Sequence, residues 1–182
     1  MNRTEAVALL HEYTASESLR RHALAVEGAL RAYAMELGED PELWGVTGLL
    51  HDFDYEMHPR APDHPLKGSV ILAERGVDGE IRQAILGHVP ETGVPRSSRL
   101  AVMLYACDEL CGFLVACALV RPDRFEGLAW ASVRKKLKDK AFARSVSREE
   151  IQAGVEEAGL NMEAHTEFLI QALRRIPEVL GP

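Results

Sequence analysis

The segment GLLHDFDYEMHP ends an apolar stretch on the adjacent pair His51-Asp52 and then adds Asp54, Glu56 and His58. Imidazole nitrogens and carboxylate oxygens are ligands for divalent metals, and they also serve as general acids and bases. One such pair is equally explained as a helix that ends on polar residues. The positions of the remaining histidines decide between these two interpretations.

Further polar residues of the same kinds interrupt or end apolar helical patterns elsewhere in the chain: His22, His64, His88 and Asp108. A single histidine on an apolar helix face is more often a hydrogen-bonded core residue than a ligand. A carboxylate buried there is costly unless it is paired or bound to a metal. Together with His51 and Asp52, these residues offer nitrogen and oxygen donors without a thiolate. That set suits one or two divalent ions of Fe, Mn, Co, Ni or Zn.

The elements that must position these residues are all expected to be helices. Apolar residues recur at helical spacing, and no alternating run predicts a strand. A TASE sequence predicts a helix start with Thr14 as the N-cap, and Asp40-Pro41 predicts another. Helices are expected over about 15–37, 41–52, 65–75, 79–88, 98–120, 147–158 and 162–176, with a loop over 53–63. The predicted fold class is therefore all-α.

Composition indicates one globular domain over residues 1–182, with 47% hydrophobic residues and a net charge of −7. An acidic chain of this kind is not expected to bind nucleic acid stably or to attach to anionic membranes. The apolar stretch 100–120 is long enough to span a bilayer, but Asp108 and Glu109 near its middle favour a buried core helix. Three cysteines without a CxxC pair fit a reducing cytoplasm better than a disulfide framework.

The order His22, His51-Asp52, Asp108 resembles the H…HD…D signature of the HD-domain superfamily of metal-dependent phosphohydrolases. The resemblance covers about residues 16–120 and leaves 121–182 as a C-terminal helical extension. The segments LLHDFDYEMHP, HPLKGSVIL and DELCGFLVACALVRP are similar to the bacterial HDIG-like branch. Phe53-Asp54 stands where that branch has Ile-Gly. No GYP sequence follows within 53–120, which disfavours a cyclic dinucleotide phosphodiesterase of the HD-GYP kind.

The resemblance implies two metal positions. His22, His51, Asp52 and Asp108 would hold the first ion, while His64 and His88 would hold the second, with Asp52 bridging. Asp54, Glu56 and Glu109 are candidates for orienting the imidazoles, and each is equally explained as a solvated acid. Asp52, Lys67 and Asp54 are the expected catalytic residues, with Lys67 one helical turn from His64 and able to reach a phosphate oxygen.

A strongly basic segment, residues 134–144, has two interpretations. It is either an exposed helical face or a patch that attracts an anionic substrate through Lys135, Lys136, Lys138 and Lys140. His11 and His165 lie outside the signature and are interpreted as surface residues.

The predicted function is hydrolysis of a phosphate ester in a nucleotide or related small molecule by metal-activated water. Two alternatives stay open. The same ligands resemble those of diiron oxygenases within the HD superfamily, and a non-catalytic module could sense a nucleotide. The substrate, the physiological metal and the oligomeric state are not defined by the sequence.

Overall fold

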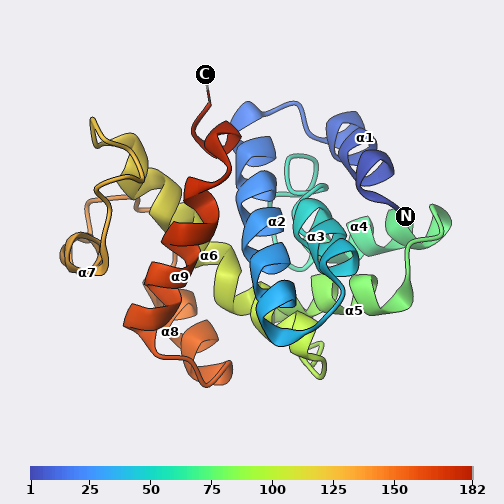
Figure 1. Ribbon diagram of the computed structural model, residues 1–182. Coiled ribbons are helices and arrows are strands. Elements are labelled where there is room, and N and C mark those ends of the chain that lie inside the picture. Colours follow the sequence, from blue (N-terminus) through green and yellow to red (C-terminus); the bar gives the residue numbers. More distant parts are fainter. Residues whose placement is uncertain (182) are drawn as a thin grey trace.

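The computed structural model describes residues 1–181, and within them every regular element is a helix (Figure 1). The all-α prediction is confirmed. In chain order the elements are α1 (Arg3–Tyr13), α2 (Glu17–Leu37), α3 (Pro41–Leu50), α4 (Asp63–Glu74), α5 (Gly79–His88), η1 (Pro90–Thr92), α6 (Arg99–Leu119), α7 (Trp130–Leu137), α8 (Arg148–Glu157), α9 (Met162–Arg174) and η2 (Pro177–Leu180).

Local sequence explains where the helices begin and end. Asp40 caps α3 by accepting a hydrogen bond from the amide of Glu42 at 2.8 Å, and Pro41 takes the first helical position. Gly38 ends α2 in the left-handed conformation with φ 72°. The N-cap of α2 is Ser16, whose hydroxyl accepts from the amide of Leu19, so the prediction of Thr14 is wrong by two residues.

Two long helices, α2 and α6, run through the middle of the molecule (Figure 1). Leu30 of α2 and Leu104, Leu110 and Leu114 of α6 are fully buried in the main hydrophobic core. Helix α6 is long and apolar enough to cross a membrane, but 67% of its most apolar window is buried by other parts of this chain. Such a helix is explained as the core helix of a globular fold.

A second, smaller core joins α1, α3, α4 and α5. Leu49 and Leu50 of α3 are fully buried there with Leu72 of α4 and Ile85 of α5. Helix α3 packs on α2, while α5 packs on both α3 and α6, so these contacts link the smaller core to the two long helices. The pair His51-Asp52 follows α3 directly.

The C-terminal helices α8 and α9 pack against α6. His165 of α9 is buried, so its interpretation as a surface residue is wrong, whereas His11 is exposed as expected. The Nε2–H group of His165 donates to the carbonyl of Ala106 at 3.0 Å, and its Nδ1 accepts from the hydroxyl of Tyr33. This histidine therefore ties α9 to both long helices.

The close contact of α2 and α3 generates a prediction for Gly48. A Cβ atom at this position would lie 2.7 Å from the backbone nitrogen of Glu27. We expect Gly48→Ala to separate the two helices and to lower the free energy of unfolding by about 1–3 kcal/mol in urea denaturation. Gly79→Ala is the control, because only the end of the Arg82 side chain comes within 4 Å of its new Cβ. Equal stability of the two variants would contradict the close-contact argument.

Candidate metal centre

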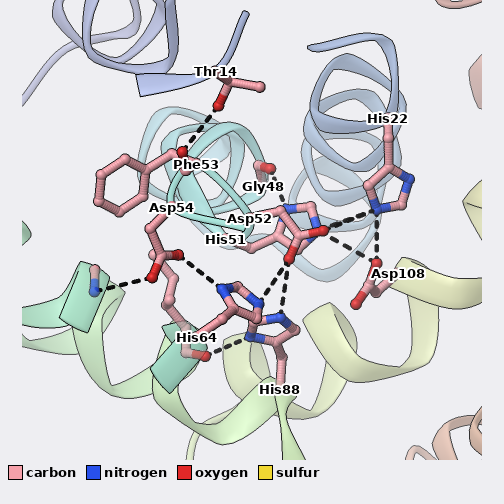
Figure 2. Close-up of polar contacts among 12 residues, drawn as sticks. Thr14, His22, Gly48, His51, Asp52, Phe53, Asp54, His64, His88 and Asp108 are labelled. Carbon is pink, nitrogen blue, oxygen red and sulfur yellow. Dashed lines mark hydrogen bonds and ion pairs between the residues drawn. The ribbon is translucent and has the colours of Figure 1, made fainter. Parts of the chain in front are cut away.

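Six donor residues from five parts of the chain point toward one another (Figure 2). His22 lies on α2, His64 on α4, Asp108 on α6, and His88 is the last residue of α5. The pair His51-Asp52 follows α3. Donor atoms fall into two groups, His22, His51 and Asp108 in one and Asp52, His64 and His88 in the other, and within each group all of them lie within 4.8 Å of one another.

In the first group, two imidazole nitrogens lie close to the same carboxylate oxygen. Oδ1 of Asp108 lies 2.9 Å from Nε2 of His22 and 3.3 Å from Nε2 of His51. The two imidazole Nε2 atoms are themselves 3.2 Å apart. Three donor atoms from α2, α3 and α6 therefore meet at one place.

Asp52 lies between the two groups. Its Oδ1 is 3.1 Å from Nε2 of His64 and 3.3 Å from Nε2 of His88. Its Oδ2 is 3.5 Å from Nε2 of His51 and 3.8 Å from Nε2 of His22. One carboxylate thus offers a separate oxygen to each group.

The outer nitrogens of three imidazoles, those of His51, His64 and His88, are hydrogen-bonded away from this centre. Nδ1 of His51 donates to the carbonyl of Gly48 at 2.8 Å, and Nδ1 of His88 donates to the carbonyl of Ile85. In a neutral imidazole this leaves the Nε2 lone pair free to accept. Lone pairs and carboxylate oxygens then face one another and need a positive charge between them, so the donor set fits divalent metal ions.

In the absence of a metal, protons supply that charge. Burial by itself lowers the pKa of His51, but the carboxylates of Asp52 and Asp108 outweigh it and raise this pKa to about 10. The pKa of His64 is raised to about 9 against its burial by hydrogen bonds to Asp52 and Asp54. Burial alone would raise the pKa values of Asp52 and Asp108, but the charge of His51 holds both well below the usual range. Hydrogen bonds from His64 and His88 add to this effect at Asp52, and one from His22 adds to it at Asp108. Metal ions must displace these protons.

Asp54 is fully buried and lies behind His64 (Figure 2). Its Oδ1 accepts from Nδ1 of His64 at 2.8 Å, and its Oδ2 accepts from the amide of Gly68 at 3.0 Å. A Cβ at position 68 would lie 2.4 Å from the Asp54 carboxyl carbon, so glycine leaves room for this carboxylate. Asp54 is absent from the cavity lining and contacts His64, which supports its interpretation as a residue that orients this imidazole, and its catalytic role stays a prediction.

The other two acids considered for orienting imidazoles do not contact them. The carboxylate of Glu56 accepts from the amides of Ala15 and Ser16 at 2.7 and 3.0 Å, at the start of α2. Glu109 accepts from the amide of Ser147 at 2.8 Å, and burial, with the charge of Asp108, raises its pKa to about 7. Glu109 lines the cavity, whereas Glu56 stabilises the helix that carries His22.

A cavity of about 730 Å³ opens onto the donor residues. Lys67 is not among its lining residues: this side chain is exposed and forms an ion pair with Asp63 at 2.8 Å, and its catalytic role stays a prediction. The basic residues proposed to attract a substrate also lie outside the lining, namely Lys135, Lys136, Lys138 and Lys140. Arg21, which the sequence interpretation did not include, does line the cavity.

Comparison with known proteins identifies the class. The HD domain family model matches residues 19–111, just over half of the chain, and the match includes all six donor residues. The chain belongs to the HD domain family. Members of this family are generally metal-dependent hydrolases that bind divalent metals. A search of the curated proteins and a search of the solved structures gave no match.

The raised histidine pKa values generate a prediction about pH. A histidine whose pKa is raised on folding stabilises the fold fully below its unfolded value of about 6.5, and this stabilisation is lost as pH rises through the folded value. With chelator, we expect the melting temperature to fall by about 5 °C or more between pH 7 and pH 9. With added Mn²⁺ the fall should be smaller, because bound imidazoles are already deprotonated. Identical pH profiles with and without metal would contradict the predicted site.

The position of Asp54 generates a second prediction. Asp54→Asn keeps the side-chain shape but removes the charge that holds Nδ1 of His64, so we expect a loss of about 10–100-fold in metal affinity, measured by calorimetry with Mn²⁺. Asp63→Asn is the matched control, because Asp63 is exposed and pairs with Lys67. Unchanged affinity in Asp54→Asn would mean that this carboxylate only fills space behind His64.

Proposed function

We propose that the chain is a metal-dependent phosphohydrolase that cleaves a phosphate ester of a nucleotide or related small molecule. The observation that carries this proposal is the position of Asp52, which offers one carboxylate oxygen to each of two donor groups. His22, His51 and Asp108 would hold one divalent ion, and His64 and His88 the other. We include in the proposal a place in the HDIG-like branch, which the segments around His51 and His64 support.

Each residue of the centre has a defined task in such a reaction. Divalent ions held by these residues would lower the pKa of bound water, so that hydroxide is available at neutral pH, and would place positive charge beside the phosphoryl oxygens. Asp52 keeps the two donor groups together. Asp54 holds the tautomer and the ring orientation of His64, and the carbonyls of Gly48 and Ile85 do the same for His51 and His88.

The dimensions of the cavity support a small substrate. A volume of about 730 Å³ lies within the range typical of small-molecule sites. The lining includes His22, His64 and His88, so a molecule in the cavity would reach both donor groups. We therefore expect a small phosphorylated partner rather than a nucleic acid or a membrane surface. The cytoplasmic location that we also propose is supported by the three free cysteines.

Asp52→Asn tests this function. The change removes one negative charge from between the two donor groups, so we expect metal content to fall from two ions toward none. Phosphate release from a panel of phosphoesters should fall by more than about 100-fold. The fold should survive, because α3 is held by buried Leu49 and Leu50. Metal analysis, phosphate release and thermal melting are measured together, with Asp63→Asn as the control.

The outcomes separate the alternatives. Full metal occupancy and full activity in Asp52→Asn would overturn the proposed centre. Oxygen consumption by the iron-loaded wild-type protein, without phosphate release, would favour a diiron oxygenase. Tight nucleotide binding without any turnover would favour a sensing module.

A further inference from the structure

The charges around the cavity are unusual for a site expected to take a phosphorylated molecule. Among the described residues of the lining, Arg21 is the only lysine or arginine. Three glutamates line the cavity in addition to Asp52 and Asp108, namely Glu91, Glu109 and Glu150. Two divalent ions in the centre would compensate a single phosphate group. A second phosphate group, farther from the two ions, would lie near these carboxylates. The guanidinium of Arg21 would then be the one basic side chain of the lining to compensate its charge.

The three glutamates lie on elements close to the donor residues. Glu109 follows Asp108 on α6, and its carboxylate accepts from the amide of Ser147 at 2.8 Å. Ser147 is the N-cap of α8, and Glu150 lies in the first turn of that helix. Glu91 lies in η1, directly after the helix that ends on His88. These carboxylates therefore belong to the same elements as the donor residues or to elements packed on them.

Most of the remaining lining is apolar, apart from the hydroxyl-bearing side chains of Ser18, Tyr55 and Ser145. Gly112, Val115 and Leu119 extend along α6 from Asp108, and Leu19 of α2 and Val146 complete this part of the cavity. Apolar surface next to a polar centre accommodates an uncharged organic body. Hydroxyl or amino groups on that body could donate to the glutamate carboxylates.

We propose that the site takes phosphate monoesters carrying one phosphate group on a compact, uncharged or cationic body, and that Glu91 and Glu150 exclude a second phosphate. This proposal rests on the proposed function and specifies the substrate class of the same site. Like charges brought together at a binding surface lower affinity strongly, so nucleoside di- and triphosphates should be rejected.

The test compares mono-, di- and triphosphates of each of the four common ribonucleosides with the Mn²⁺-loaded protein. We expect kcat/KM for phosphate release to be highest for the monophosphates, by about tenfold or more. Binding supplies an independent readout. Methylene phosphonate analogues of the same series should bind in the same order in calorimetry, without any reaction.

The variant Glu91→Gln combined with Glu150→Gln removes two charges without altering a metal donor. We expect the preference for mono- over triphosphate to fall by about tenfold in both readouts, with metal content unchanged. Glu163→Gln is the matched control, because this glutamate is exposed on α9 outside the cavity lining. It should leave the preference at the wild-type value.

The possible failures are distinguishable. Equal or better turnover of the triphosphates, or an unchanged preference in the double variant, would overturn the exclusion and leave the phosphohydrolase intact. Failure of every compound to release phosphate and of every analogue to bind would overturn the proposed function, and the inference with it.

Discussion

The structure depends on one electrostatic constraint: acceptor atoms from five parts of the chain face one another at the end of α3. The carboxylates of Asp52 and Asp108 and the Nε2 atoms of four histidines meet within hydrogen-bonding distance or a little beyond. Such an arrangement is stable only with positive charge between the atoms, supplied by protons or by metal ions. Asp52 contributes most to this arrangement, because its two carboxylate oxygens face different donor groups.

The fold supplies the donors at helix ends and on the two central helices, where packing fixes their direction. His51 and His88 end their helices and donate to carbonyls three residues earlier. His22 and Asp108 lie on α2 and α6, which share the main core. His64 is held differently, by the buried carboxylate of Asp54, for which the absence of a side chain at Gly68 leaves space. Buried hydrogen bonds to the Nδ1 atoms of three histidines therefore fix the orientation of their imidazole rings.

Much of this could be predicted from the sequence, because helical periodicity and capping residues are local signals. The helices and the approach of His22, His51-Asp52 and Asp108 followed from the positions of polar residues on apolar helices. The roles of Asp54, Glu56 and Lys67 depend on where the chain turns between α3 and α4, which no local pattern determines. Glu91 and Glu150 were missed for the same reason, since they join Glu109 at the cavity only after α5, α6 and α8 have packed.

Crystallographic anomalous scattering tests the central claim most directly. Crystals of protein purified without chelator and supplied with Mn²⁺ would be measured at an energy where manganese scatters anomalously. The account predicts two peaks, one beside His22, His51 and Asp108 and the other beside His64 and His88, with one oxygen of Asp52 on each. No anomalous peak beside these residues, with their direct hydrogen bonds retained, would contradict it.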